Sequence, residues 1–411
     1  MVDTNRKGDT VSPDEAVIKT INLGRRVAAT EASADLARAF ALVYPDAGKP
    51  PAVAVIDGVT LSAVDQNPAT PQIDLIDLVF NGVAAVTPTA MTLDPLGRYL
   101  YVATGGSVWV IDINPGSSTL HKVVDVIAIP STFSITGKLT DLAVNSNGTR
   151  LYVSAPATEL FGGTRGYVVG GRELGKILVI NVDESDRPVP TVAVPHPANP
   201  RNYRKVIAGL TAGIEPYGIK ATAQPDKMIF TSRLKGAGDM GLATIVVTSN
   251  DPSSFAANVR GINLQLSNNV QQKYQLYIRN PSDVVVLPDL SYAFVLDWGV
   301  PLSVGSSDPG TLIDYMDTHD TGSKVGIIKD PFNLTSGAQI LAATSPIPMT
   351  FATEIQLSSD NKKLYATYLC YNFICPDRNS RGLFPMPHLR EFPRGEIWER
   401  FGIDLKCQKY A

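Results

Sequence analysis

The stretch TAMTLDPLGRYLYVAT (89–104) decides the fold, because the chain repeats its pattern several times. An alternating apolar segment leads into a turn of Pro, Asp, Asn or Gly, and a second segment follows that carries an aromatic residue. The clearest further copies are TDLAVNSNGTRLYVSA (140–155) and TEIQLSSDNKKLYATY (353–368). Repetition of one such unit indicates a repeat architecture. Three looser copies are VAATEASADLARAFAL (27–42), GIKATAQPDKMIFTSR (218–233) and SDVVVLPDLSYAFVLD (282–297).

Each copy is predicted to form a β-hairpin. Alternating side chains place one face of a strand in the core, and turns rich in Asx and Gly tolerate positive φ. We expect the aromatic residues to hold equivalent positions on the second strand of each unit and to pack between neighbouring units. They are Phe40, Tyr101, Tyr152, Phe230, Phe294 and Tyr365.

Most copies are followed by a third apolar segment, such as SVWVIDI (107–113) or KILVINV (176–182), and by a plausible fourth. Four antiparallel strands in each unit predict an all-β chain, a β-propeller whose blades repeat around an axis. An irregular β-sandwich is the alternative, since unrelated hairpins look alike. The common register of the six copies favours the propeller.

Composition excludes several classes of protein. Of the 411 residues, 44% are apolar and 18% charged, which is typical of a chain with a large core rather than a disordered one. The 36 basic and 39 acidic residues give a net charge of −3, without the basic excess of a nucleic-acid-binding protein. No apolar run is long enough to predict a membrane span, and the polar N-terminus has no signal-peptide core.

The strings LDPLGRYLYVAT (93–104) and VNSNGTRLYVSA (144–155), each followed by an apolar strand, resemble the YVTN-type repeat of surface-layer and lactonase-like β-propellers. The resemblance covers residues 15–375. It implies six or seven four-stranded blades, and a bacterial or archaeal chain that is part of a larger secreted or cell-surface protein. Because propellers host many unrelated functions, it specifies the fold better than the activity.

We expect residues 1–375 to form the propeller domain. Residues 376–411 form a charged tail that either completes the last blade or links to another module. The apolar segment Val17–Leu23 is expected to pair with the last blade and close the ring, because an unpaired outer strand would expose its backbone groups.

The segment GTLIDYMDTHDTGSK (310–324) is the candidate metal site. Asp314, Asp317 and Asp320 offer the hard oxygen ligands that Ca²⁺ prefers. His319 would be a neighbour rather than a ligand, since imidazole suits softer metals. A solvated acidic loop is the alternative, because the order of a calcium-loop consensus is missing.

Two further features have a functional and a structural interpretation each. Arg165 and Arg172, in a Gly-rich loop, can meet an anionic ligand, or the loop can pack on its neighbour. Cys370 and Cys375 can close a small disulfide; Cys407 is another possible partner, and reduced thiols are a third interpretation.

No catalytic residue is predicted. The four histidines lack metalloenzyme spacing, and no G-x-S-x-G occurs. Positions expected on the innermost strands, such as Ala90, Leu142, Ile219 and Val284, are apolar or small. The sequence therefore favours a non-catalytic scaffold or binding module, without a cofactor other than the candidate Ca²⁺, that takes a protein or surface ligand on its loops. The resemblance supplies the alternative, a lactonase-like hydrolase with a metal-dependent site in the channel.

Overall fold

The computed structural model describes residues 19–133, 135, 139–156, 175–188, 202–213, 215–233, 241–262, 278, 281–297, 324–333, 339–343, 350–358, 361, 363–370 and 402–408. These residues form strands and two short 3-10 helices, Ser131–Phe133 and Glu184–Asp186. The all-β class is confirmed. The chain divides into two compact units, Met1–Pro130 and Ser131–Ala411.

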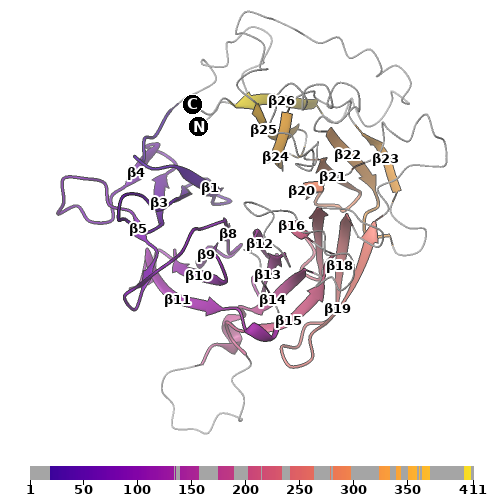
Figure 1. Ribbon diagram of the computed structural model, residues 1–411, viewed down its shortest axis with the longest axis horizontal. Coiled ribbons are helices and arrows are strands. Elements are labelled where there is room, and N and C mark those ends of the chain that lie inside the picture. The colour runs from indigo at the N-terminus through magenta and orange to yellow at the C-terminus, as the bar shows by residue number, and fades with distance from the viewer. Residues whose placement is uncertain are drawn as a thin grey trace, which may run out of the picture. The chain divides into compact units, whose positions relative to one another are not determined.

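The first unit holds two sheets of sequential antiparallel strands (Figure 1). One consists of β1 (Val27–Ala32), β2 (Arg38–Val43), β3 (Ala52–Asp57) and β4 (Ser62–Val64), with the short β5 (Ile76–Asp77) also on β3. The other consists of β8 (Ala90–Leu93), β9 (Tyr99–Ala103), β10 (Ser107–Asp112) and β11 (Lys122–Ala128). A small hairpin of β6 (Val79–Phe80) and β7 (Val83–Ala84) connects them.

The second unit continues the pattern with three four-stranded antiparallel sheets (Figure 1). Their strands are β12 (Asp141–Val144), β13 (Arg150–Ala155), β14 (Lys176–Asn181) and β15 (Val206–Thr211); β16 (Glu215–Ala221), β17 (Lys227–Arg233), β18 (Leu242–Ser249) and β19 (Ala256–Ile262); and β20 (Pro281–Val286), β21 (Tyr292–Asp297), β22 (Lys324–Lys329) and β23 (Gln339–Ala343). The first strand of each sheet packs against the first strand of the next. Such a succession of blades is the arrangement of a β-propeller.

The last repeat departs from the expected six or seven four-stranded blades. Strands β24 (Thr350–Leu357), β25 (Lys363–Cys370) and β26 (Gly402–Gln408) form a sheet of three. The C-terminal segment supplies β26, which runs parallel to β25 and therefore does not continue the antiparallel order. Within the described residues, five blades are complete.

The expected closing strand is also corrected. Lys19–Leu23, the described part of the segment Val17–Leu23, forms no strand. The side chain of Asn22 accepts the Gly24 N–H at 2.8 Å, and Gly24 has a φ of +65°. This turn ends the segment just before β1, because a left-handed glycine does not continue an extended strand.

Five of the six aligned aromatics lie on the second strands and are at most 1% exposed. Tyr152 and Phe230, from consecutive sheets, belong to one apolar cluster together with Ile219 and Ala143. The predicted packing between units is therefore confirmed for this pair. Tyr365 holds the same backbone register on β25, opposite Gln356. The five buried aromatics are Phe40, Tyr101, Tyr152, Phe230 and Phe294.

Candidate functional site

Three acidic residues hold the same position on the first strands of three sheets in the second unit. In each sheet the residue opposite the acid comes two positions after the repeat's aromatic. The acids and their opposite residues are Asp141 with Ser154, Asp283 with Leu296, and Glu354 with Thr367.

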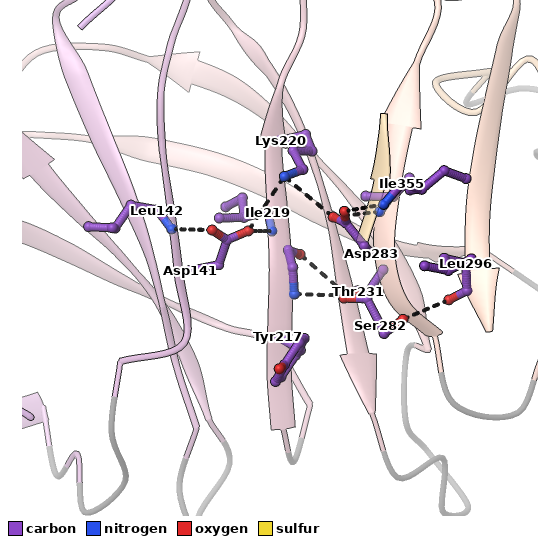
Figure 2. A network of polar contacts seen from close by, with 12 residues as sticks. Asp141, Leu142, Tyr217, Ile219, Lys220, Thr231, Ser282, Asp283, Leu296 and Ile355 are labelled. Atoms are coloured by element: carbon purple, nitrogen blue, oxygen red, sulfur yellow. Dashed lines mark hydrogen bonds and ion pairs between the residues drawn. The ribbon is translucent and has the colours of Figure 1, made fainter. Parts of the chain in front are cut away.

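The intervening sheet contributes a lysine to this inner-strand cluster, which we define as Asp141, Lys220, Asp283 and Glu354. Lys220 lies on β16, which packs against both β12 and β20. Its Nζ is 3.5 Å from Oδ1 of Asp283 and 4.0 Å from Oδ2 of Asp141 (Figure 2). One ammonium group is therefore shared by two carboxylates from the flanking sheets.

Both aspartates also accept backbone hydrogen bonds (Figure 2). In Asp141, Oδ1 accepts the Leu142 N–H and Oδ2 accepts the Ile219 N–H, each at 2.9 Å. In Asp283, the N–H of the next residue, Val284, donates to Oδ1 at 2.9 Å, and the Ile355 N–H donates to Oδ2 at 3.0 Å. Each carboxylate thus ties its own strand to the first strand of the following sheet.

Two threonine hydroxyl groups make further contacts between sheets. Thr140 Oγ1 donates to the Pro216 carbonyl at 3.1 Å, and Thr231 Oγ1 donates to the Ser282 carbonyl at 3.2 Å. Gly218 lies so close to the next sheet that a Cβ on it would be 2.7 Å from the Ser282 carbonyl oxygen. Polar contacts therefore join these consecutive sheets, in addition to the apolar cluster that contains Ala143 and Ile219.

Burial shifts the titration of two acids in the cluster. The side chain of Asp141 is 21% exposed, and its surroundings raise its pKa to about 6, although Lys220 acts in the opposite direction. Desolvation likewise raises the pKa of Glu354, which solvent nevertheless reaches. The side chain of Asp283 is 6% exposed.

Most residues predicted as sites lie outside the described residues. These are Asp314, Asp317 and Asp320, with His319, and also Arg165, Arg172 and Cys375. Cys370 ends β25, and Cys407 lies on the adjacent β26. Among the described residues, no group of three or more His, Cys, Asp or Glu side chains could hold a metal ion. The same part of the chain has no helix that could cross a membrane.

Sequence reasoning had treated the innermost strands as apolar and had missed the inner-strand cluster. Leu142, Ile219 and Val284 are indeed buried, but an acid directly precedes two of them. A signal was present, because a hydroxyl residue followed by an acid begins three copies: Thr140–Asp141, Ser282–Asp283 and Thr353–Glu354. No repeated signal marks Lys220.

No protein-family model and no curated protein matches this sequence. Among solved structures, hydrazine synthase from Kuenenia stuttgartiensis is 15% identical, with a TM-score of 0.48, covering 82% of this chain and 71% of that one. A protein from Bacteroides uniformis, assigned provisionally as a 6-phosphogluconolactonase, is 12% identical, with a TM-score of 0.46 and coverages of 82% and 76%. A protein from Lactobacillus plantarum is 15% identical, with a TM-score of 0.45 and the same coverages. Similarity at this level assigns neither family nor function.

Proposed function

We propose that this chain is a non-catalytic β-propeller that serves as a scaffold or binding module, in a larger prokaryotic surface or secreted protein. The observation that carries the proposal is that two of the inner-strand acids accept backbone hydrogen bonds between consecutive sheets. Asp141 and Asp283 each accept two backbone N–H groups, one of them from the following sheet. These two acids of the described inner strands are thus engaged in holding blades together.

This engagement disfavours a catalytic role for Asp283 in particular. Its carboxylate has two backbone donors and a lysine ammonium at 3.5 Å, and it is almost fully buried. Leaving a buried backbone N–H without an acceptor costs about 1–3 kcal/mol. A carboxylate held in this way has little freedom to exchange protons with a substrate or to approach one.

The partner surface in this proposal consists of the loops between strands, because such loops carry binding residues on rigid scaffolds. A protein or a surface ligand is the proposed partner. Arg165 and Arg172 are the proposed contacts for an anionic group, on the sequence evidence of their Gly-rich loop.

A lactonase-like hydrolase with a metal-dependent site is the second candidate, and one observation favours it. Asp141 and Glu354 both have raised pKa values near Lys220. Carboxyl groups in such surroundings are typical of general acids and bases. A hydrolase would therefore be expected to use Asp141 and Glu354, and not Asp283.

A lactone-hydrolysis assay of the purified full chain, combined with metal analysis, separates the two candidates. We expect no turnover of an aliphatic or a sugar lactone above the rate in buffer, with or without added divalent metal. The hydrolase would be established by a tightly bound metal ion at one per chain, together with lactone turnover that Asp141→Asn and Glu354→Gln abolish. Asp226→Asn, at an exposed turn residue, is the matched control.

A further inference from the structure

The inner-strand cluster has more negative than positive groups. Asp141, Asp283 and Glu354 lie on three first strands, and Lys220 is the cation that acts on all three. Asp141 and Asp283 both lie within 4.0 Å of the same Lys220 nitrogen, so they are also close to each other. When every group is ionised, the acids repel one another across the sheets. Uptake of a proton would relieve that repulsion.

The geometry distinguishes the two aspartates. Lys220 Nζ is closer to Asp283, at 3.5 Å, than to Asp141, at 4.0 Å. Each aspartate accepts two backbone N–H groups, so these hydrogen bonds do not distinguish the two. The shorter ammonium contact makes Asp283 the carboxylate that keeps Lys220 when the two acids compete for it. Asp141 is the weaker partner of Lys220.

We propose that Asp141, Lys220 and Asp283 form a proton-responsive contact between three consecutive blades, in which Asp141 takes up the proton. The proton comes from solvent, which reaches the partly exposed Asp141 side chain. Lys220 then remains with Asp283, and the repulsion between the first strands of the β12–β15 and β20–β23 sheets decreases. The raised pKa of Asp141 agrees with this assignment.

The charged groups around Asp141 come from three of the strands described. Lys220 on β16 attracts it, and Asp283 on β20 repels it. On β13 the opposite residue is the uncharged Ser154. Glu354 on β24 interacts with Lys220 and with Asp283, and so competes for the same ammonium group. Lys220 is therefore the group whose removal should change the titration most.

An NMR titration of the full chain, labelled with ¹³C at the aspartate carboxyl carbons, tests the proposal. The resonance that disappears in Asp141→Asn identifies Asp141. We expect it to titrate with a midpoint of about 6. In Lys220→Met the midpoint should rise by about one pH unit, because the attracting charge is gone. In Lys220→Arg, which keeps the charge, it should stay near the wild-type value.

Two outcomes would overturn the proposal. One is an Asp141 resonance that titrates in the ordinary carboxyl range, near pH 4. The other is a wild-type midpoint that Lys220→Met leaves unchanged, which would remove the lysine from the titrating contact. If Lys220→Met does not fold, the wild-type titration and Lys220→Arg still decide the first outcome. Asp226→Asn serves as the control, since it should leave the Asp141 midpoint in place.

Discussion

Ile219 donates its backbone N–H to Oδ2 of Asp141 at 2.9 Å, and the contact joins two consecutive sheets. Strand β16 is the edge strand of its own sheet, with β17 on one side only. On its open side, an edge strand has N–H groups for which no neighbouring strand offers a carbonyl acceptor. The aspartate of the preceding sheet fills this role, and Asp283 does the same for Ile355 on the edge strand β24.

Removal of either carboxylate should therefore destabilise the fold. We expect Asp141→Ala and Asp283→Ala to lower the free energy of unfolding by about 1–3 kcal/mol each, because backbone N–H groups lose their acceptors. Asp283→Ala should cost more, since its site is the more buried one. Urea unfolding measures both values, and Asp226→Ala is the control. Stability equal to that of the control would show that these contacts hold no blades together.

The pKa of Asp141 predicts a specific dependence of stability on pH. Because the pKa is raised to about 6 in the fold, the folded state binds this proton more tightly than the unfolded state does. The contribution to stability is therefore full below the unfolded-state value near 4 and is lost as the pH rises through 6. Asp141→Asn should remove a pH-dependent difference of about 1–2 kcal/mol between roughly pH 4.5 and 7. Parallel stability curves for wild type and variant would contradict this prediction.

Gly218 should tolerate no side chain. A Cβ there would lie 2.7 Å from the Ser282 carbonyl oxygen and 3.0 Å from Oδ1 of Asp283, so the two sheets would have to separate. We expect Gly218→Ala to cost about 1–3 kcal/mol, as overpacking of a close contact does. Gly116→Ala is a suitable control, because its nearest contact would be an ordinary 3.6 Å. Thermal melting of the two variants makes the comparison, and equal melting temperatures would argue against the close approach.

The buried aromatics should each contribute strongly to stability. Phe230 and Phe294 are 0% and 1% exposed, so Phe230→Ala and Phe294→Ala should each cost about 3–5 kcal/mol. Phe255→Ala, at a partly buried position of the same cluster as Phe230, should cost less. Chemical denaturation measures all three. An unchanged midpoint in either core variant would contradict the register assigned to the repeats.

The acidic loop should not bind calcium. Asp314, Asp317 and Asp320 have no consensus order that would make their oxygens converge, so we expect solvated carboxylates whose repulsion is screened by salt. Calorimetric titration of the wild type with Ca²⁺ should give no micromolar binding. Micromolar affinity that Asp317→Asn abolishes would establish a calcium site instead.

The repeat was predictable from the sequence because it depends on local patterns. Short apolar segments identify β9, β13 and β21 as strands, and Asx–Gly turns such as the one at Asn145–Gly148 identify hairpins. The expectation of one buried face is wrong for β9 and β13, which are buried along their whole length. The buried aromatics follow from the same register. The number of complete blades did not follow, because the partner of β25 comes from beyond residue 400 and pairs in parallel. The sequence pattern near β25 does not predict a parallel partner strand from the C-terminal segment.

By itself, then, the sequence determined the all-β class and the hairpins, since each depends on neighbours a few residues apart. Only the tertiary structure brought Lys220 between Asp141 and Asp283. Those contacts connect different sheets, and they depend on register shifts between Pro216 and Ile219 in β16 and between Pro281 and Asp283 in β20. A bulge re-aims the side chains beside it. Packing across sheets therefore decides which polar groups meet between blades. The residue pattern of a single strand does not predict which side chains of another sheet it will contact.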